Sequence, residues 1–368
     1  MLLALLLLAC ARPPASQVPF SDPADPGLFD AGVTTRHFID ARGKALTVEI
    51  WYPAAAEPGD EPDPYPELAF TLDAYRDAPP VAGPWPLVAF SHGYGGIRWQ
   101  SAFLTEHLAR HGFVVVAPDH PHNTLYDLDP TLTAEVAAER PGDIVSSVDY
   151  VHEAVRDPRD ALVGMVASSA YGVVGHSFGA FTALVVGGGV LDPASGAAWC
   201  AEHDPAGCDF FADLDTAVLA QAVPDPRASA TVTLAPGGWY AFGDDGLQGV
   251  RAPLELAGDA DSDLPYDEEG RPTWEALGAP KRLLTLHGAG HWGFTDLCRF
   301  VPGLLDCSGA SGGFMEPERV RTVTKTAVTA SLEVQVAHDD RYQPFVDAPA
   351  WEGQDDVTFE EAAPPGAR

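Results

Sequence analysis

The pattern in the sequence with the clearest chemical meaning is a serine between two glycines, Gly175-His176-Ser177-Phe178-Gly179. The apolar run Tyr171–Val174 precedes it and small residues follow it, which is typical of a buried strand that turns sharply into a helix. The flanking positions of such a turn need glycine because side chains there would clash. The same spacing recurs at Gly309–Gly313, but no strand pattern precedes that copy. We therefore predict Ser177 as a nucleophile, with a glycine-rich packing turn as the alternative.

A serine hydroxyl is a weak nucleophile unless an imidazole takes its proton. In the strand-turn-helix arrangement the histidine comes after the serine in the chain, on a loop beyond the last strand. Two histidines compete there, because His287 ends the apolar run and His291 lies in the following loop. The glycines around His291 favour it as the base, and we expect His287 to be structural. A hydrogen-bonded structural histidine is the alternative for both.

A carboxylate must hold that imidazole in the correct tautomer, and the sequence offers three. Asp259, Asp261 and Asp263 all follow the apolar run Leu254–Gly258. The usual offset from the strand favours Asp261, while Asp259 and Asp263 remain open as alternatives. A solvated turn or a weak cation site is the other interpretation of this loop.

The oxyanion of a tetrahedral intermediate needs two preorganised donors. One comes from the residue after the serine and the other from the loop after an earlier core strand. These donors are the backbone N–H groups of Phe178 and of Tyr94, which lies in the turn Ser91–Gly96. A simple tight turn is the alternative for that segment.

Strand and helix patterns alternate along the chain, which predicts an α/β fold with a mostly parallel central sheet covered by helices on both faces. Apolar runs predict strands at 46–52, 87–90, 113–117, 171–174, 230–234, 252–256 and 282–286, and helices at 99–111, 143–155 and 320–336. Ligands bind at the carboxyl ends of such strands, where the motifs above lie. We expect one catalytic domain at 26–346, with 187–227 as a lid or cap insertion, and a polar tail at 347–368.

The composition excludes some partners. Asp and Glu number 53 against 21 Lys and Arg, a formal charge of −32. Nucleic acids and anionic membrane patches are therefore poor partners.

The N-terminus resembles an export signal. Residues 1–10 form an apolar run that is too short to span a bilayer but suits a secretory signal peptide. Leu7-Leu8-Ala9-Cys10 also resembles a bacterial lipobox, which would make Cys10 a lipidated residue and attach the protein to a membrane. Residues 11–25 are a proline-rich tether in this interpretation. A buried Leu-rich helix is the alternative. The expected location is an anchored lipoprotein, or otherwise the periplasm or the exterior.

The other four cysteines suit an oxidising compartment. The simplest pairing is Cys200 with Cys208 and Cys298 with Cys307, although spacing does not fix connectivity and four free thiols are the alternative. The sequence has no CxxC pair, which argues against zinc. We expect no metal and no organic cofactor.

From Leu87 to Phe300 the chain resembles the α/β-hydrolase branch that holds platelet-activating-factor acetylhydrolases, predicted dienelactone-hydrolase-like proteins and cutinase-like polyester hydrolases. The resemblance lies in Ser91–Gly96, Leu108–His120, Gly175–Gly179 and Gly288–Asp296. It implies the α/β-hydrolase fold, with Ser177, Asp261 and His291 as a catalytic triad and the Tyr94 and Phe178 amides as the oxyanion hole.

The resemblance also implies a substrate clamp. The polyester hydrolases carry an aromatic residue at the position of Tyr94 and a tryptophan at the position of Trp239, which would grip an acyl or aromatic group. The 187–227 insertion has no counterpart in their open clefts, and Phe178 stands where those enzymes commonly have methionine. These departures argue against polyester activity. Ser177 argues against dienelactone hydrolysis, which uses a cysteine.

The expected function is therefore a serine hydrolase that cleaves carboxylic esters of small molecules or lipids through an acyl-enzyme on Ser177. Phospholipase or acetylhydrolase activity, lipase activity and polyester hydrolysis are alternatives within this class, and an amidase is less favoured. A different class is also open, namely an inactive hydrolase fold used as a surface binding module. The sequence does not predict the oligomeric state.

Overall fold

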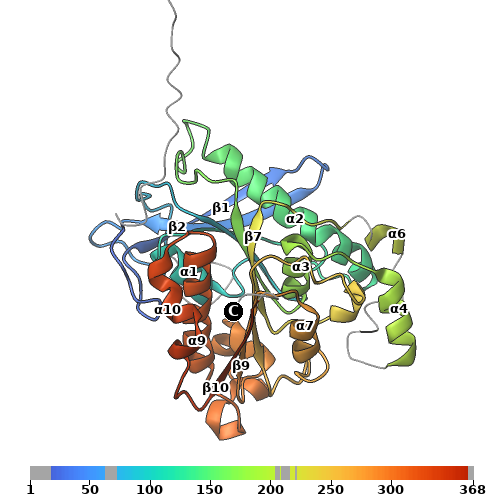
Figure 1. Cartoon of the computed structure of the whole chain (residues 1–368). Helices are drawn as coiled ribbons and strands as arrows, with labels where there is room; N and C mark the ends of the chain where they lie inside the picture. The colour runs from blue at the N-terminus through green and yellow to red at the C-terminus, as the bar shows by residue number, and fades with distance from the viewer. Residues whose placement is uncertain (1–17, 63–72, 204–207, 209–215, 220–221, 364–368) are drawn as a thin grey trace, which may run out of the picture.

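The structure is a computed structural model, and it describes residues 18–62, 73–203, 208, 216–219 and 222–363 (Figure 1). The strands in these ranges are β1 (Asp30–Ile39), β2 (Ala45–Ala54), β3 (Ala74–Arg76), β4 (Leu87–Ser91), β5 (Val114–Pro118), β6 (Tyr171–His176), β7 (Ala228–Leu234), β8 (Pro253–Gly258), β9 (Lys281–Leu286) and β10 (Val357–Ala362). The helices are α1 (Ala102–Arg110), α2 (Thr133–Ala154), α3 (Phe178–Gly187), α4 (Pro193–Glu202), α6 (Thr216–Leu219), α7 (Gly270–Ala276), α8 (Leu297–Phe300), α9 (Pro317–Gln335) and α10 (Gln343–Val346).

All described strands belong to one sheet in the order β10-β9-β8-β7-β6-β4-β5-β2-β1-β3. From β5 to β9 the neighbouring strands are parallel. Antiparallel strands flank this core, with β2 and β1 beyond β5 and with β10 beyond β9. The carboxyl ends of the parallel strands lie at one edge, where the loops that carry the predicted site begin.

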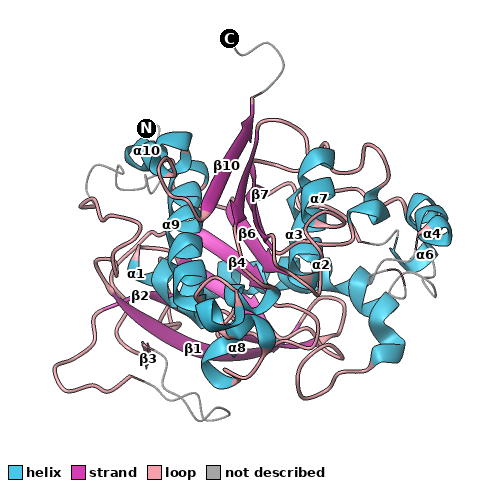
Figure 2. Ribbon diagram, turned by 90° about the horizontal axis from the view of Figure 1, so that it is seen from below, coloured by secondary structure: helices cyan, strands magenta, loops and turns pink. Residues whose placement is uncertain are grey.

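Helices cover both faces of the sheet (Figure 2). On one face α1 and α9 pack against the strands, and on the other face α2 and α3 do. The residues of β5 show how the sequence specifies the packing of helices on both faces. Val115 and Ala117 join the core cluster under α1 and α9, whereas Val114 and Val116 join the one under α2. Successive side chains of a strand point to opposite faces, so a fully apolar strand fills both cores.

The structure contains each strand and helix predicted above and extends several of them. The largest extension is in α2, which was expected to begin at residue 143. The helix instead begins at Thr133 and continues through Pro141. The added turns carry Arg140, whose side chain is fully buried.

Three strands at the margins of the sheet, β1, β3 and β10, were not predicted from the sequence. The expected polar tail at 347–368 contains β10, which pairs antiparallel with β9. Its apolar Val357 and Phe359 contact the core, while polar residues between them point away. An edge strand such as β10, with one alternating face, gives a weak pattern in the sequence. β1 contains few large apolar residues, and β3 is only three residues long, so neither gives a clear strand pattern.

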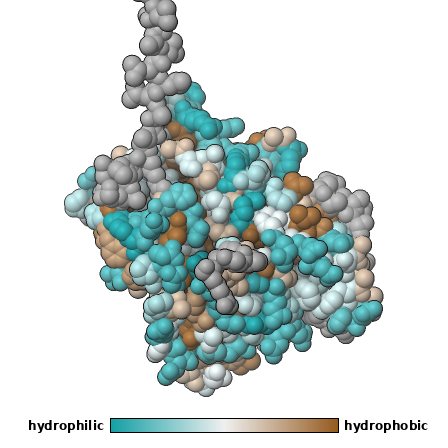
Figure 3. All heavy atoms as spheres, viewed as in Figure 1, coloured by the Kyte–Doolittle hydropathy of each residue, from teal (hydrophilic) through white to brown (hydrophobic). Residues whose placement is uncertain are grey.

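The expected signal segment 1–10 and residues 11–17 of the tether lie outside the described residues. Residues 18–25 lie against the domain, where the Pro23 carbonyl meets His107 Nε2 at 3.0 Å and the Asp25 carbonyl meets His111 Nε2 at 3.0 Å. In the described part of the chain, the helices are too short or too polar to cross a bilayer. Hydrophilic residues dominate the face in Figure 3, in keeping with the net charge of −32.

Candidate active site

Ser177 lies at the junction of β6 and α3. Its backbone has φ 55° and ψ −120°, a region that residues other than glycine rarely adopt. Its N–H donates to the Leu234 carbonyl at 2.9 Å, so the next strand holds the turn in place. Strain of this kind is kept where the surrounding structure enforces it, and it presents the serine side chain at the edge of the sheet.

The two glycines of the motif are required by close packing. A Cβ on Gly175 would lie 1.9 Å from the Gly179 carbonyl oxygen, and a Cβ on Gly179 would lie 1.9 Å from the Ser91 carbonyl oxygen. The start of α3 therefore rests directly on the ends of β6 and β4. Neither position accepts a side chain without moving backbone.

His291 and Asp261 form a buried pair. His291 Nδ1 lies 2.7 Å from Asp261 Oδ2, and the side chains are 5% and 2% exposed. A carboxylate only accepts hydrogen bonds, so Nδ1 carries the hydrogen and Nε2 is left as an acceptor. This is the tautomer that a base acting on a serine hydroxyl requires.

The other candidates in these two loops have different partners. Asp261 Oδ1 accepts the backbone N–H groups of Asp263 and Leu264, at 2.9 and 2.8 Å, which fixes its carboxylate. Asp259 instead pairs with the exposed His287, with 2.8 Å between Oδ2 and Nδ1. These two loops thus supply two His–Asp pairs, and of these two only the pair made by His291 is buried.

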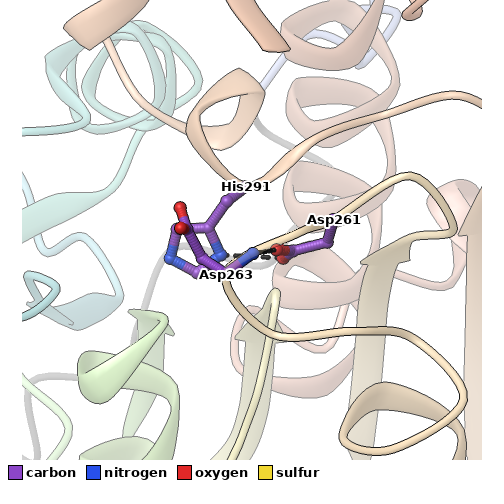
Figure 4. Close-up of side chains that lie close together, drawn as sticks. All are labelled: Asp261, Asp263 and His291. Carbon is purple, nitrogen blue, oxygen red and sulfur yellow. Dashed lines mark hydrogen bonds and ion pairs between the residues drawn. The ribbon is translucent and has the colours of Figure 1, made fainter. Parts of the chain in front are cut away.

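Asp263 also comes near His291 (Figure 4). Asp261, Asp263 and His291 each offer a potential ligand atom, and these atoms lie within 4.8 Å of one another. The hydrogen bond between His291 and Asp261 already accounts for the arrangement of those two side chains. We therefore assign no metal to this cluster.

The two expected oxyanion donors flank Ser177. Phe178 is the first residue of α3, and the N–H groups of a first helical turn point out of its N-terminal end. Tyr94 lies in the turn after β4, and its backbone N–H makes no hydrogen bond within the described residues. Both residues line the cleft that contains Ser177.

A chain of hydrogen bonds that sequence reasoning missed links the oxyanion turn to the histidine loop. The Gly93 N–H donates to Gln100 Oε1 at 3.0 Å, and Gln100 Nε2 lies 3.0 Å from His176 Nδ1. His176 Nε2 in turn lies 3.0 Å from the His291 carbonyl. His176 is fully buried, and desolvation lowers its pKa well below the usual value. The neutral ring thus donates to His291 and accepts from Gln100.

Ser177 and His291 open into the same cleft, with a volume of about 530 Å³. Its walls are mainly aromatic and apolar, which is typical of sites for small organic ligands. The lining residues are Gly93, Tyr94, Pro130, Thr133, His176, Ser177, Phe178, Phe181, Gly237, Gly238, Tyr240, Asp263, Leu264, Glu269, His291 and Trp292.

Glu269 is a carboxyl group in this apolar wall and was not predicted from the sequence. It is 2% exposed, and its Oε2 accepts the Gly238 N–H at 2.8 Å. Desolvation raises its pKa to about 7, the Gly238 hydrogen bond opposes this, and the charges of Glu268 and Asp261 add to it. Glu269 therefore changes charge near neutral pH, inside the cleft.

Trp239 is not among the residues that line the cleft. Its Nε1 donates to the Glu268 carbonyl at 2.9 Å, and its ring meets Trp199 edge to face at 5.4 Å between centroids. The adjacent Tyr240 lines the cleft in its place. The role of Trp239 as a clamp stays a prediction from the resemblance.

The described part of the 187–227 insertion contacts a residue of the cleft wall but does not itself line the cleft. Trp199 of α4 stacks on Tyr240, with centroids 4.2 Å apart and planes at 10°. Among the described residues of the insertion, none lines the cleft. The lid remains a prediction, because residues 204–207, 209–215 and 220–221 lie outside the described residues.

Both expected disulfides, Cys200–Cys208 and Cys298–Cys307, are present. This pairing confirms the sequence prediction and is consistent with an exported protein. The second disulfide closes a loop that contains Asp306. Its Oδ2 accepts the Trp292 N–H at 2.8 Å, directly after His291. The disulfide loop thus helps to hold the histidine loop.

The fold and the order of these residues along the chain define the class. The chain resembles the solved structure of a ferulic acid esterase from Streptomyces cinnamoneus, with a TM-score of 0.62 and 21% sequence identity. The match covers 95% of this chain and 98% of that one. Together with the sheet order, it shows that the chain has the α/β-hydrolase fold.

Sequence comparison gives more specific but partial matches. A profile of the family "Platelet-activating factor acetylhydrolase, isoform II" matches residues 69–136. Cutinase 2 of Thermobifida cellulosilytica and cutinase cut1 of Thermobifida fusca are each 27% identical over 208 residues, or 56% of this chain. The aligned region spans 60% and 49% of their respective lengths. The chain is thus similar to these two cutinases over somewhat more than half of its length.

Proposed function

We propose that the protein is a carboxylic ester hydrolase that works through an acyl-enzyme on Ser177. The buried His291–Asp261 pair, which opens into the same cleft as the strained Ser177, carries this proposal. The similarity to cutinases and to the acetylhydrolase family supports the same class.

In the first step, Ser177 Oγ attacks the ester carbonyl carbon while His291 Nε2 takes the hydroxyl proton. The negative oxygen of the tetrahedral intermediate accepts the Tyr94 and Phe178 N–H groups. When the intermediate collapses, the bond to the alcohol oxygen breaks and His291 returns the proton to that oxygen. The alcohol leaves, and the acyl group stays on Ser177.

In the second step, water attacks the acyl carbon and His291 takes a proton from it. The bond to Ser177 Oγ breaks, the serine regains its proton, and the carboxylic acid leaves. Asp261 stays ionised throughout and stabilises the imidazolium that forms twice in each cycle. The cleft of about 530 Å³ suits an acyl or aromatic group of moderate size.

Hydrolysis of p-nitrophenyl esters from acetate to palmitate, with Ser177→Ala as control, tests this mechanism. We expect turnover that falls by about 10³-fold or more in the variant. The chain-length profile separates an acetylhydrolase from a lipase. Ethyl ferulate and a polyester film extend the series toward the substrates in the relatives' names. Turnover that survives in Ser177→Ala would contradict the proposed nucleophile.

An inactive binding module is the rival of a different class. A fluorophosphonate probe reacts only with an activated serine, so it distinguishes the two functions without knowledge of the substrate. We expect labelling of the wild-type protein and none of Ser177→Ala. An unlabelled but folded wild type would favour the binding module.

We also propose that the protein is exported and carries lipid on Cys10. The Leu7–Cys10 motif and the two disulfides support this proposal. Metabolic labelling with a radioactive fatty acid in a bacterial host should mark the wild type and not Cys10→Ala. Equal labelling of both would contradict attachment at Cys10.

A further inference from the structure

Arg140 of α2 is 0% exposed and lies behind both proposed oxyanion donors. Its guanidinium carbon is 4.4 Å from the centroid of the Phe178 ring. Its Nη2 donates to the carbonyl of His92, two residues before Tyr94. A single side chain thus contacts both segments from which the donor N–H groups come.

The guanidinium is held by neutral acceptors. Nε donates to Thr182 Oγ1 at 3.0 Å, and Nη1 donates to Asn123 Oδ1 at 2.6 Å. Nη2 also donates to Ser91 Oγ at 3.1 Å. Within the described residues, no carboxylate comes within ion-pair distance of Arg140. A buried arginine usually has such a partner, so Arg140 is unusual in that no adjacent carboxylate neutralises its positive charge.

Asp143, whose charge acts on Arg140, is paired with other cations. It pairs with Arg42 and Lys44 at 2.6 and 3.0 Å. A relay of hydrogen bonds also connects it to Arg140, in which His120 Nδ1 lies 3.0 Å from Asp143 and His120 Nε2 lies 3.0 Å from Ser91 Oγ. Desolvation lowers the pKa of Arg140 to about 9, so it still carries its charge at neutral pH.

We propose that Arg140 is a positioning residue for the oxyanion hole. It fixes the His92 carbonyl, which sets the course of the turn to Tyr94, and it fixes the Phe178 ring at the start of α3. Because Arg140 is buried, its charge also favours the negatively charged intermediate over the neutral substrate. This inference rests on the proposed esterase function and adds to it.

Such a role affects the transition state more than ground-state binding. Loss of one oxyanion donor lowers kcat about 10²- to 10³-fold, so disordering both donors indirectly should lower it about 10- to 100-fold. Arg140→Met removes the charge and all four hydrogen bonds while keeping an unbranched chain. We expect kcat on p-nitrophenyl butyrate to fall by that factor, with KM changed less than about threefold.

The inhibition constant of a boronic acid tests the oxyanion hole specifically, because a purely structural role of Arg140 would leave it unchanged. Butaneboronic acid adds to an active serine as a tetrahedral anion and so mimics the intermediate. Its inhibition constant in Arg140→Met should rise by the same factor by which kcat/KM falls. The matched control is Thr182→Val, which removes the hydrogen bonds of this hydroxyl with Arg140 Nε and with the Phe178 carbonyl but keeps the cation and its other three hydrogen bonds. We expect it to stay within about threefold of the wild type in both measurements.

If Arg140→Met does not fold, Arg140→Lys replaces it. Lysine keeps the charge but lacks the planar fork that reaches Thr182, Asn123 and His92 together. We expect a fall in kcat of about threefold to tenfold, with the inhibition constant rising in step. A folded Arg140 variant with wild-type kcat, or one whose loss lies entirely in KM, would overturn the inference.

The proposed function and this inference fail in different ways. Wild-type protein that does not react with a fluorophosphonate would remove the esterase proposal itself. Wild-type protein that reacts at Ser177, together with Arg140 variants that match it in kcat and in boronate affinity, would remove only the role of Arg140.

Discussion

Replacing Glu269 with glutamine should stabilise the protein at alkaline pH and change little at acidic pH. Glutamine keeps an oxygen that can accept the Gly238 N–H but cannot ionise. The folded state raises the pKa of Glu269 from 4.5 to about 7, so between these values it binds more protons than the unfolded state. Stability therefore falls as the pH rises through this window, and the loss is complete above about pH 7.

The size of the effect follows from the same values. Each unit by which the pKa differs between the folded and unfolded states corresponds to about 1.4 kcal/mol. The shift of Glu269 therefore lowers the unfolding free energy by at most about 3 kcal/mol. The side chain is only 2% exposed, but it borders the cleft and water there reduces the penalty. We therefore expect Glu269→Gln to be about 2–3 kcal/mol more stable than the wild type at pH 8, relative to the difference at pH 4.

Urea unfolding at pH 4, 6 and 8 measures this difference directly. The matched control is Glu268→Gln, the exposed neighbour, which should change the unfolding free energy by less than about 0.5 kcal/mol at each pH. A Glu269→Gln difference that is the same at pH 4 and pH 8 would refute the argument, because it would mean that Glu269 ionises in the folded protein as it does in the unfolded chain.

Three further predictions concern the turn, the histidine loop and the disulfide beside it. Gly179→Ala should lower the unfolding free energy by about 2 kcal/mol or more and abolish turnover, since the new Cβ would lie 1.9 Å from a β4 carbonyl oxygen; an unchanged melting temperature would argue against this packing. His291→Ala should lower kcat on p-nitrophenyl butyrate at least about 10³-fold, whereas His287→Ala should stay within about threefold, and equal losses would remove the distinction between the two histidines. The double variant Cys298→Ser, Cys307→Ser should lose about 2–3 kcal/mol in urea unfolding, and an unchanged midpoint would show that this disulfide contributes nothing.

The central strands and the order of the site residues could be predicted because both leave a local pattern. Short apolar runs such as Val114–Ala117 are fully buried, and the sequence predicts them without tertiary information. Asp261 is predicted from its offset after one such run, and His291 from its place in the glycine-rich loop after another. The structure pairs these two with each other and pairs Asp259 with His287.

What the sequence did not predict depends on contacts between distant segments. Arg140 precedes a proline and a glycine, so its local pattern predicts the end of a helix rather than a buried cation. Gln100 and Glu269 are ordinary polar residues whose roles depend on partners 76 and 31 positions away. Only the assembled fold brings those partners together.

The relay behind Arg140 also bears on how hydrolases are recognised from coordinates. Ser91, His120 and Asp143 repeat the hydroxyl–imidazole–carboxylate order of a triad, with both links at 3.0 Å. All three side chains are 0% exposed, and Ser91 ends a regular strand rather than a strained turn. A search that matched only atom types and distances would therefore also return this buried set. Ser177 differs from Ser91 in two respects, because it opens into the cleft and its backbone has a positive φ. These two features distinguish a reactive serine from a buried structural one.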